Sequence, residues 1–274
     1  MKNVREPAVA GMFYPSSSVK LREEIQLLLD ANKPREKYQN IFGIVSPHAG
    51  YVYSGRTAAI AYNTIADKSY KTVIIISPSH KEYFPGVSIY SGDAYKTPLG
   101  SVSLNKEMIA GLTSGEKFIF EGMNGHRGEH ALEVQLPFLQ MVLKDFSIIP
   151  IVMGDQRRMF VDGLAQKLAD TVDEDTLIIA SSDLSHFHTK REAGKIDALI
   201  EKRISDFDFR GLQNDLEVKN CEACGGGGIV TLMKAAAFCG KTGSAVLSRT
   251  DSGDVTGDDT EVVGYLSAVI FEPI

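Results

Sequence analysis

Three short apolar runs constrain the fold of this chain most, because each of them ends in serine and is followed by histidine. They are GIVSPH at 43–48, TVIIISPSH at 72–80 and LIIASSDLSH at 177–186. Nearly continuous Val, Ile and Leu is typical of strands buried on both faces of an α/β sheet. Ligands of open α/β sheets bind at the carboxyl ends of the strands. We therefore expect His48, His80 and His186 to lie at one edge of one sheet.

The segments between and after these runs have helical patterns, and this alternation predicts βαβ units with parallel strands. Alternating residues and glycines over 84–104 predict hairpin-like strands, and Pro137 is expected to kink the helix that contains it. Further strands are predicted over 146–152 and 262–271, and helices over 17–32, 54–66, 129–144, 157–172, 190–206 and 227–238.

Composition narrows the function classes. The 274 residues carry a net charge of −6, which argues against a nucleic-acid partner, since phosphate contacts need clustered Lys and Arg. No secretion signal and no apolar stretch of membrane-spanning length is evident, so we expect a cytoplasmic protein without a membrane partner. Three cysteines in a chain of this length do not form a disulfide framework, and we expect free thiols, metal ligands or catalytic groups.

The segment SSDLSHFH at 181–188 is dense in groups that handle protons or metals. Asp183 is a candidate ligand, a partner that orients a histidine, or a helix cap. His186 is a candidate general acid or base, because imidazole titrates near neutral pH. His188 is expected at the surface. Ser181, like the serines of the other two runs, is expected only to end its strand.

The segment HRGEHALEVQLPFL at 126–139 is the second candidate region. Glu129 and Glu133 are four residues apart and would share one face of a helix. His130 beside them could move protons or hold substrate. The alternative is a solvated first helical turn, where acidic residues suit the helix dipole.

The segment NCEACGGGG at 220–228 is the third. Cys221 and Cys224 form a CxxC motif, which alone is weak evidence for a metal site because no second pair follows. We expect the glycines to form a loop that allows close backbone approach and exposes N–H groups at a helix start. Cys224 is thus a candidate metal ligand or nucleophile, or a buried cysteine before a turn. Cys239 is expected to pack in the core.

Together these motifs resemble the Memo-like protein family, called AmmeMemoRadiSam system protein B in prokaryotes. The resemblance covers almost the whole chain, in the same order. It rests on REPAVAGMFYP near the start, SPHAGYVYSG at 46–55, ISPSH at 76–80, EHALEVQLPFL at 129–139, SSDLSHF at 181–187 and CGGGGI at 224–229.

This resemblance implies a single domain over residues 1–274, with the fold of the class III extradiol dioxygenases: a central mixed sheet flanked by helices and a metal pocket at one edge. It places the metal ligands on His48, His80 and Cys224. Asp183 and His186 match neighbouring pocket residues. The dioxygenases have a carboxylate as third ligand where this chain has a cysteine, so the shared fold does not imply the shared reaction.

Three functions follow as hypotheses. The first is a metal-dependent redox protein, an oxidoreductase with iron(II) as the expected metal and copper or zinc as alternatives, in which Asp183, His186 and His130 act beside the metal. The second, implied by the resemblance, is a module that binds a peptide or protein in a vestigial metal pocket. The third is a metal-free enzyme in which Cys224 and His186 act as nucleophile and base. The substrate is an unknown small molecule or peptide, and the resemblance implies a radical SAM protein as a pathway partner.

Overall fold

A computed structural model describes residues 3–66 and 68–273 of the chain, and its centre is one large mixed sheet. The strand order is β10-β12-β2-β9-β3-β8-β4-β7. Strand β11 lies outside this order and pairs antiparallel with β12. The strands of this sheet are β2 (Ile41–Ser46), β3 (Thr72–Pro78), β4 (Val87–Tyr90), β7 (Ile119–Gly122), β8 (Ser147–Met153), β9 (Thr176–Ser181), β10 (His186–His188), β11 (Gly243–Asp251) and β12 (Val262–Phe271).

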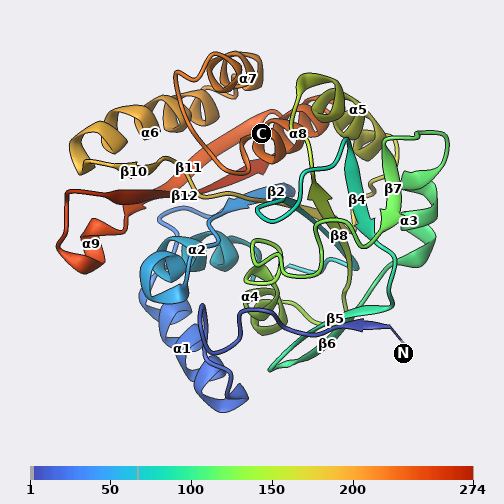
Figure 1. The fold of residues 1–274 in the computed structure, drawn as a ribbon, viewed down its shortest axis with the longest axis horizontal. Helices are drawn as coiled ribbons and strands as arrows, with labels where there is room; N and C mark the ends of the chain where they lie inside the picture. The colour runs from blue at the N-terminus through green and yellow to red at the C-terminus, as the bar shows by residue number, and fades with distance from the viewer. Residues whose placement is uncertain (1–2, 67, 274) are drawn as a thin grey trace.

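Helices cover both faces of this sheet, as Figure 1 shows, with α1, α2 and α4 on one side and α5 to α8 on the other. The predicted mixed sheet flanked by helices is confirmed. The helices are α1 (Ser18–Ala31), α2 (Tyr51–Ile65), α3 (Lys106–Thr113), α4 (Gln135–Val142), α5 (Arg158–Ala169), α6 (Lys190–Ser205), α7 (Phe209–Glu217), α8 (Gly226–Phe238) and α9 (Gly253–Thr256).

A small second sheet holds the N-terminal segment against the rest of the chain. Its order is β1-β5-β6, and β5 and β6 form an antiparallel hairpin within the predicted 84–104 region. Its strands are β1 (Val4–Arg5), β5 (Ala94–Thr97) and β6 (Gly100–Ser103). In the part of the chain that the structure describes, no helix is long and apolar enough to cross a membrane.

The three apolar runs form parallel neighbours, with β9 between β2 and β3. Every residue of these strands is buried, which explains their nearly continuous apolar sequence. Ser46 pairs with Ser181, and Ile76 pairs with Ala180, so the three strands end at the same level. The loops that carry the histidines therefore leave one edge of the sheet together.

The predicted helix over 129–144 is wrong in its first part. Residues 131–134 form turns, and α4 begins only at Gln135. Pro137 consequently lies in the first turn, where a missing N–H breaks no helical hydrogen bond, and it does not kink a longer helix. Glu129 and Glu133 therefore share no helix face: Glu133 binds the Arg5 guanidinium and the Tyr14 hydroxyl instead.

Candidate metal centre

His48 follows β2 and is 1% exposed, with each ring nitrogen facing a different partner. Its Nδ1 lies 2.9 Å from Ser181 Oγ and its Nε2 lies 3.1 Å from Cys224 Sγ. Burial, followed by the neighbouring histidines, holds the pKa of His48 well below its ordinary value. The imidazole is therefore neutral near pH 7, which is the form that binds a metal.

A buried hydrogen-bond chain decides which nitrogen of His48 carries the proton. Tyr62 donates to Gln135 Oε1 at 2.6 Å, so the Gln135 amide nitrogen faces the other way and donates to Pro47 O and to Ser181 Oγ, the latter at 2.8 Å. The Ser181 hydroxyl donates its own hydrogen bond to Ala131 O at 2.7 Å. Its remaining lone pair can only accept, so His48 Nδ1 must donate to it. The Nε2 lone pair of His48 is left free on the side of Cys224.

His80 reaches the same result through a carboxylate. Glu129 Oε1 lies 2.9 Å from His80 Nδ1, and Glu129 Oε2 accepts the backbone N–H of His80 at 2.6 Å. Burial alone would raise the pKa of Glu129, but its hydrogen bonds and the charge of His80 outweigh burial and lower it to about 2. The ionised carboxylate accepts the Nδ1 proton of His80, so Nε2 is the ring nitrogen that remains for a metal.

Cys224 lies directly before α8, against the end of β9. The backbone N–H of Asp183 donates to its Sγ at 3.2 Å. The next residue must be small, because a Cβ on Gly225 would meet Ser181 O at 2.3 Å. Burial, and secondarily the Asp183 carboxylate, raises the pKa of the Cys224 thiol. Without a cation beside it the sulfur is therefore a protonated thiol near pH 7.

The ligand atoms of His48, His80 and Cys224 lie within 4.8 Å of one another. Two imidazole nitrogens and one sulfur are a donor set that fits a transition metal, and the three residues leave further coordination positions for other ligands. A second group with the same spacing shares one histidine: His80, Glu129 and His130. In that group the Glu129 oxygen nearest His80 already accepts hydrogen bonds from the imidazole and from the backbone of His130.

The structure brings the other predicted residues to the rim of this centre. Asp183 Oδ1 accepts the backbone N–H of His48 at 2.7 Å, and burial raises the pKa of Asp183 to about 6. His130 Nδ1 lies 3.3 Å from Glu129, and its ring stacks on His80 with centroids 4.8 Å apart. His186 is half-buried on β10. Asp183, His130 and His186 all line a cavity of about 500 Å³.

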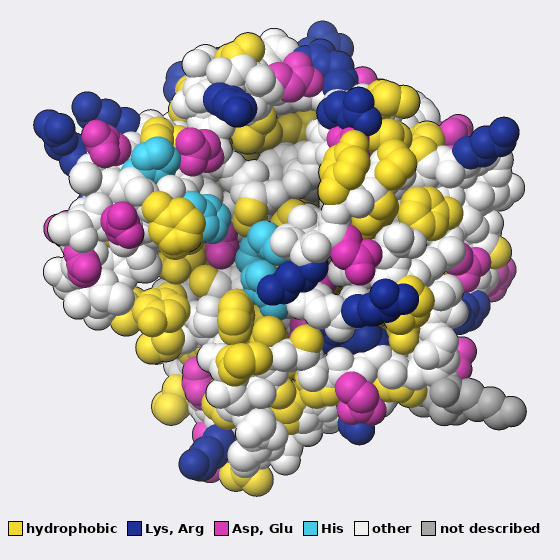
Figure 2. All heavy atoms as spheres, viewed as in Figure 1, with side chains coloured by type: hydrophobic (Ala, Val, Ile, Leu, Met, Phe, Trp, Pro, Cys, Tyr) yellow, Lys and Arg dark blue, Asp and Glu magenta, His cyan; other side chains and the backbone are white. Residues whose placement is uncertain are grey.

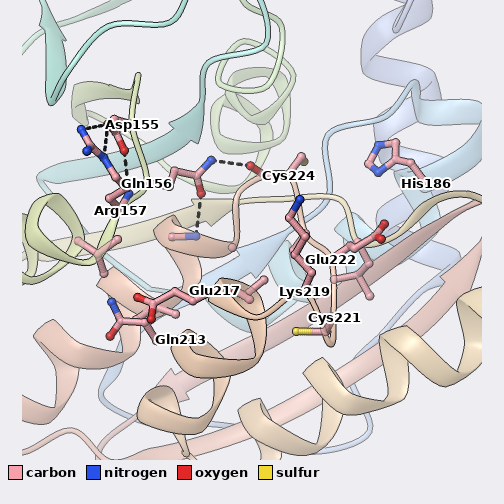
Figure 3. A pocket seen from close by; sticks show the side chains of 17 residues that line it. Asp155, Gln156, Arg157, His186, Gln213, Glu217, Lys219, Cys221, Glu222 and Cys224 are labelled. Carbon is pink, nitrogen blue, oxygen red and sulfur yellow. Dashed lines mark hydrogen bonds and ion pairs between the residues drawn. The ribbon is translucent and has the colours of Figure 1, made fainter.

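The centre is open to the surface. Figure 2 shows the histidine side chains gathered in and beside a hollow in the middle of one face. A second cavity, of about 730 Å³, is lined by Cys224 and His186 and extends toward α7 and the start of α8 (Figure 3). His186 thus stands between two cavities.

The sequence-based interpretation needs two corrections here. Ser181 does more than end its strand, because its hydroxyl contacts the His48 ring. The glycines after Cys224 do not form a loop: α8 begins at Gly226. Their N–H groups are also not left exposed, since Ser182 Oγ accepts from Gly225 and Gln156 Oε1 accepts from Gly227.

Sequence reasoning also missed residues that organise the centre. The sequence predicts Glu129 only as an acidic residue of a helix start and gives Gln135 no role, although both help to orient a histidine. An available signal was the sequence EHALEVQ itself, in which three polar residues, Glu129, Glu133 and Gln135, are interspersed with apolar ones and are buried. Cys221 is 2% exposed, and burial raises the pKa of its thiol to about 11. His188 pairs with Glu222 at 3.0 Å on the surface.

Comparison with known proteins agrees with this arrangement. The family model described as Memo-like protein matches residues 5–269. The chain belongs to the Memo-like protein family. A MEMO1 family protein of Thermotoga neapolitana is 39% identical over 97% of this chain and 99% of its own length. A MEMO1 family protein of Thermoplasma volcanium is 37% identical over 97% of this chain and 98% of its own length.

A solved structure supports the fold of this Memo-like chain. It is an uncharacterized protein from Escherichia coli K12, with a TM-score of 0.51 over 83% of this chain and 98% of that protein. The two sequences are 10% identical, so this likeness concerns the fold alone.

Proposed function

We propose that this Memo-like protein is a metal-dependent redox protein whose metal is held by His48 Nε2, His80 Nε2 and Cys224 Sγ. One observation carries the proposal: two separate hydrogen-bond systems each engage the Nδ1 of a histidine, and both histidines belong to one group with a cysteine sulfur, with their ligand atoms within 4.8 Å of one another. Metal-bound histidines are held in this way, with the second ring nitrogen donating to an oxygen.

The donor set favours a redox-active metal. Two histidines and one anionic ligand with open positions suit iron(II), and a thiolate also suits copper(I) or zinc. Bound iron would supply electrons to dioxygen or activate it. Metal binding would also keep Cys224 as a thiolate, because a bound cation opposes the burial that raises its pKa.

The residues around the proposed centre have separate tasks. Asp183 fixes the loop of His48 by accepting its backbone N–H and donates its own N–H to the cysteine sulfur. His130, whose Nδ1 faces Glu129, presents its other nitrogen for proton transfer with a substrate in the 500 Å³ cavity. His186 lines both cavities, so it is placed to exchange protons with a molecule bound in either of them.

The test is metal analysis of protein purified without oxygen. We expect about one iron per chain in the native protein, and its loss in both His48→Ala and Cys224→Ser. Cys239→Ser is the matched control, because Cys239 lies at the end of α8 and outside both cavities. Full metal content in either ligand variant would overturn the assignment. Oxygen consumption by the iron-loaded protein then tests the redox part of the proposal.

The contact of 3.1 Å between Cys224 Sγ and His48 Nε2 also supports a second candidate, a metal-free Cys–His enzyme. Here the base would be His48, since it is the histidine in contact with the sulfur. The raised pKa of Cys224 disfavours it, because a nucleophilic cysteine requires the thiolate. Rapid alkylation of Cys224 at neutral pH in protein without metal would support this second function and reject the first.

A further inference from the structure

The cavity of about 730 Å³ has a charge pattern of its own, separate from the proposed metal ligands. Two of its acidic side chains form ion pairs with arginines, Asp155 with Arg157 at 2.6 Å and Glu217 with Arg158 at 2.7 Å, and Glu222 lies 3.0 Å from His188. Lys219 differs from them. Among the described residues it takes part in no ion pair or hydrogen bond through its ammonium group, so it is a cation of the cavity wall without a partner.

The backbone of Lys219 adds a second reason to look at this side chain. Lys219 has φ of +60° and lies just beyond α7, after the C-cap Val218. This position favours glycine or asparagine, since other residues cost roughly 1–2 kcal/mol in the left-handed region. In Figure 3 the Lys219 side chain extends along the cavity toward the side on which Cys224 and His186 lie. A strained lysine is thus directed at the region of the proposed centre.

The remaining wall is mostly apolar, with one unsatisfied donor. Val161, Leu184, Leu216 and Val230 line it. Gln213 lines it too; it is 6% exposed, and its Nε2 has no hydrogen-bond partner among the described residues. A buried amide without a partner is unfavourable by about 1–3 kcal/mol. A bound molecule with a hydrogen-bond acceptor would satisfy the Gln213 amide and remove this unfavourable free energy.

We propose that this cavity binds a small organic carboxylate, whose charge is recognised by Lys219 and whose hydrocarbon part lies on the apolar wall. This inference deepens the proposed function by naming a substrate class for the same centre, and its relevance to catalysis rests on that function. A carboxylate with an apolar body matches the unpartnered lysine and the apolar wall together. A polyanion would meet Glu217 and Glu222 at the same rim.

The test uses hexanoate and 1-hexanol as probes, titrated into metal-depleted protein and followed by calorimetry. We expect hexanoate to bind at least about tenfold more tightly than 1-hexanol, as a charge-assisted hydrogen bond predicts. Lys219→Asn should remove this preference. Because asparagine tolerates the left-handed conformation, the unfolding temperature of this variant should equal or exceed that of the native protein. The matched control is Lys37→Asn, an exposed lysine outside the cavity, which should keep the preference.

The position of the probe is checked by alkylation followed by mass spectrometry. Hexanoate should slow the alkylation of Cys224 and leave that of Cys239 unchanged, because only the former lines this cavity. Equal binding of the two probes, an unchanged preference in Lys219→Asn, or no protection of Cys224 would each overturn the inference. These titrations contain no metal, so carboxylate binding and metal binding are tested independently. Either experiment can fail while the other succeeds.

Discussion

The two flanks of the proposed metal centre hold their histidines in opposite ways. His48, between β2 and β9, is 1% exposed and is oriented by a neutral hydroxyl and amide chain. His80, after β3, has a side chain that is 29% exposed and is oriented by the ionised carboxylate of Glu129. Both arrangements engage Nδ1 and keep Nε2 available for a metal.

The difference shows what each flank depends on. The His48 flank is set by packing, since each member of its hydrogen-bond chain is buried in the core. The His80 flank is set by charge, since one carboxylate accepts from His80, His130 and Ala131. We therefore expect the two flanks to respond differently to pH and to substitution.

The largest expected effect is on the pH dependence of stability in metal-depleted protein. The pKa of Glu129, lowered to about 2, means that this residue stabilises the fold above about pH 4.5, and that the stabilisation is lost as the pH falls toward 2. The contribution of Asp183 to stability changes with pH in the opposite direction, because its pKa is raised to about 6. This contribution is favourable below about pH 4 and is lost as the pH rises through 6. Each effect is roughly 3 kcal/mol at most.

Urea unfolding between pH 2 and pH 8 measures these contributions. Glu129→Gln should flatten the fall in unfolding free energy on the acid side. Asp183→Asn should flatten the fall between pH 4 and pH 6. Curves that run parallel to that of the native protein would show that neither carboxylate has the assigned state.

The next largest effect is that of Glu129→Gln on metal affinity. The amide keeps the size of the side chain but directs an N–H₂ group toward donors that need an acceptor. We expect affinity to fall up to about 100-fold, the upper end for loss of a partner of a metal-bound histidine. Competition titration with a chelator measures it. Glu222→Gln is the control, because Glu222 hydrogen-bonds His188 at the surface and belongs to neither candidate metal group. Native affinity in Glu129→Gln would contradict the orienting role of the carboxylate.

Ser181→Ala should have a smaller effect on the other flank. It removes the acceptor of His48 Nδ1 and leaves a Gln135 N–H without one of its acceptors. We expect about tenfold weaker metal binding and a loss of about 1–3 kcal/mol in unfolding free energy. The same titration and urea unfolding measure both. A stability loss with unchanged metal affinity would assign Ser181 to packing alone.

His130→Ala should have the smallest effect on metal binding, because His130 lies outside the proposed ligand set. We expect affinity within about twofold of the native protein, and a loss of oxygen consumption in the iron-loaded variant. A large loss of metal would instead favour the second group, His80, Glu129 and His130.

Much of this architecture could be predicted from local sequence. The runs that became β2, β3 and β9 are apolar throughout because both faces are covered, and that pattern is readable in one dimension. The order of the strands was not readable, because β9 enters between β2 and β3 only when residues far apart in the chain pair.

The failure around Glu129 has a local cause. Apolar residues at helical spacing favoured a helix from residue 129 onward. The Glu129 carboxylate instead accepts the backbone N–H groups of His130 and Ala131, and such side-chain bonds compete with helix formation. The helix therefore starts at Gln135. Glu129, which orients His80, and Gln135, which donates to the Ser181 hydroxyl beside His48, lie in or beside this segment, so their role was hidden.

X-ray absorption spectroscopy of the iron-loaded protein, prepared without oxygen, would show whether Cys224 Sγ is a ligand of the metal. We expect a shell of nitrogen or oxygen ligands together with one sulfur at about 2.3 Å, the distance of a metal-bound thiolate. That sulfur should vanish in Cys224→Ser and persist in Cys239→Ser. A shell of nitrogen and oxygen alone, unchanged in Cys224→Ser, would contradict the account and place the metal on His80, Glu129 and His130.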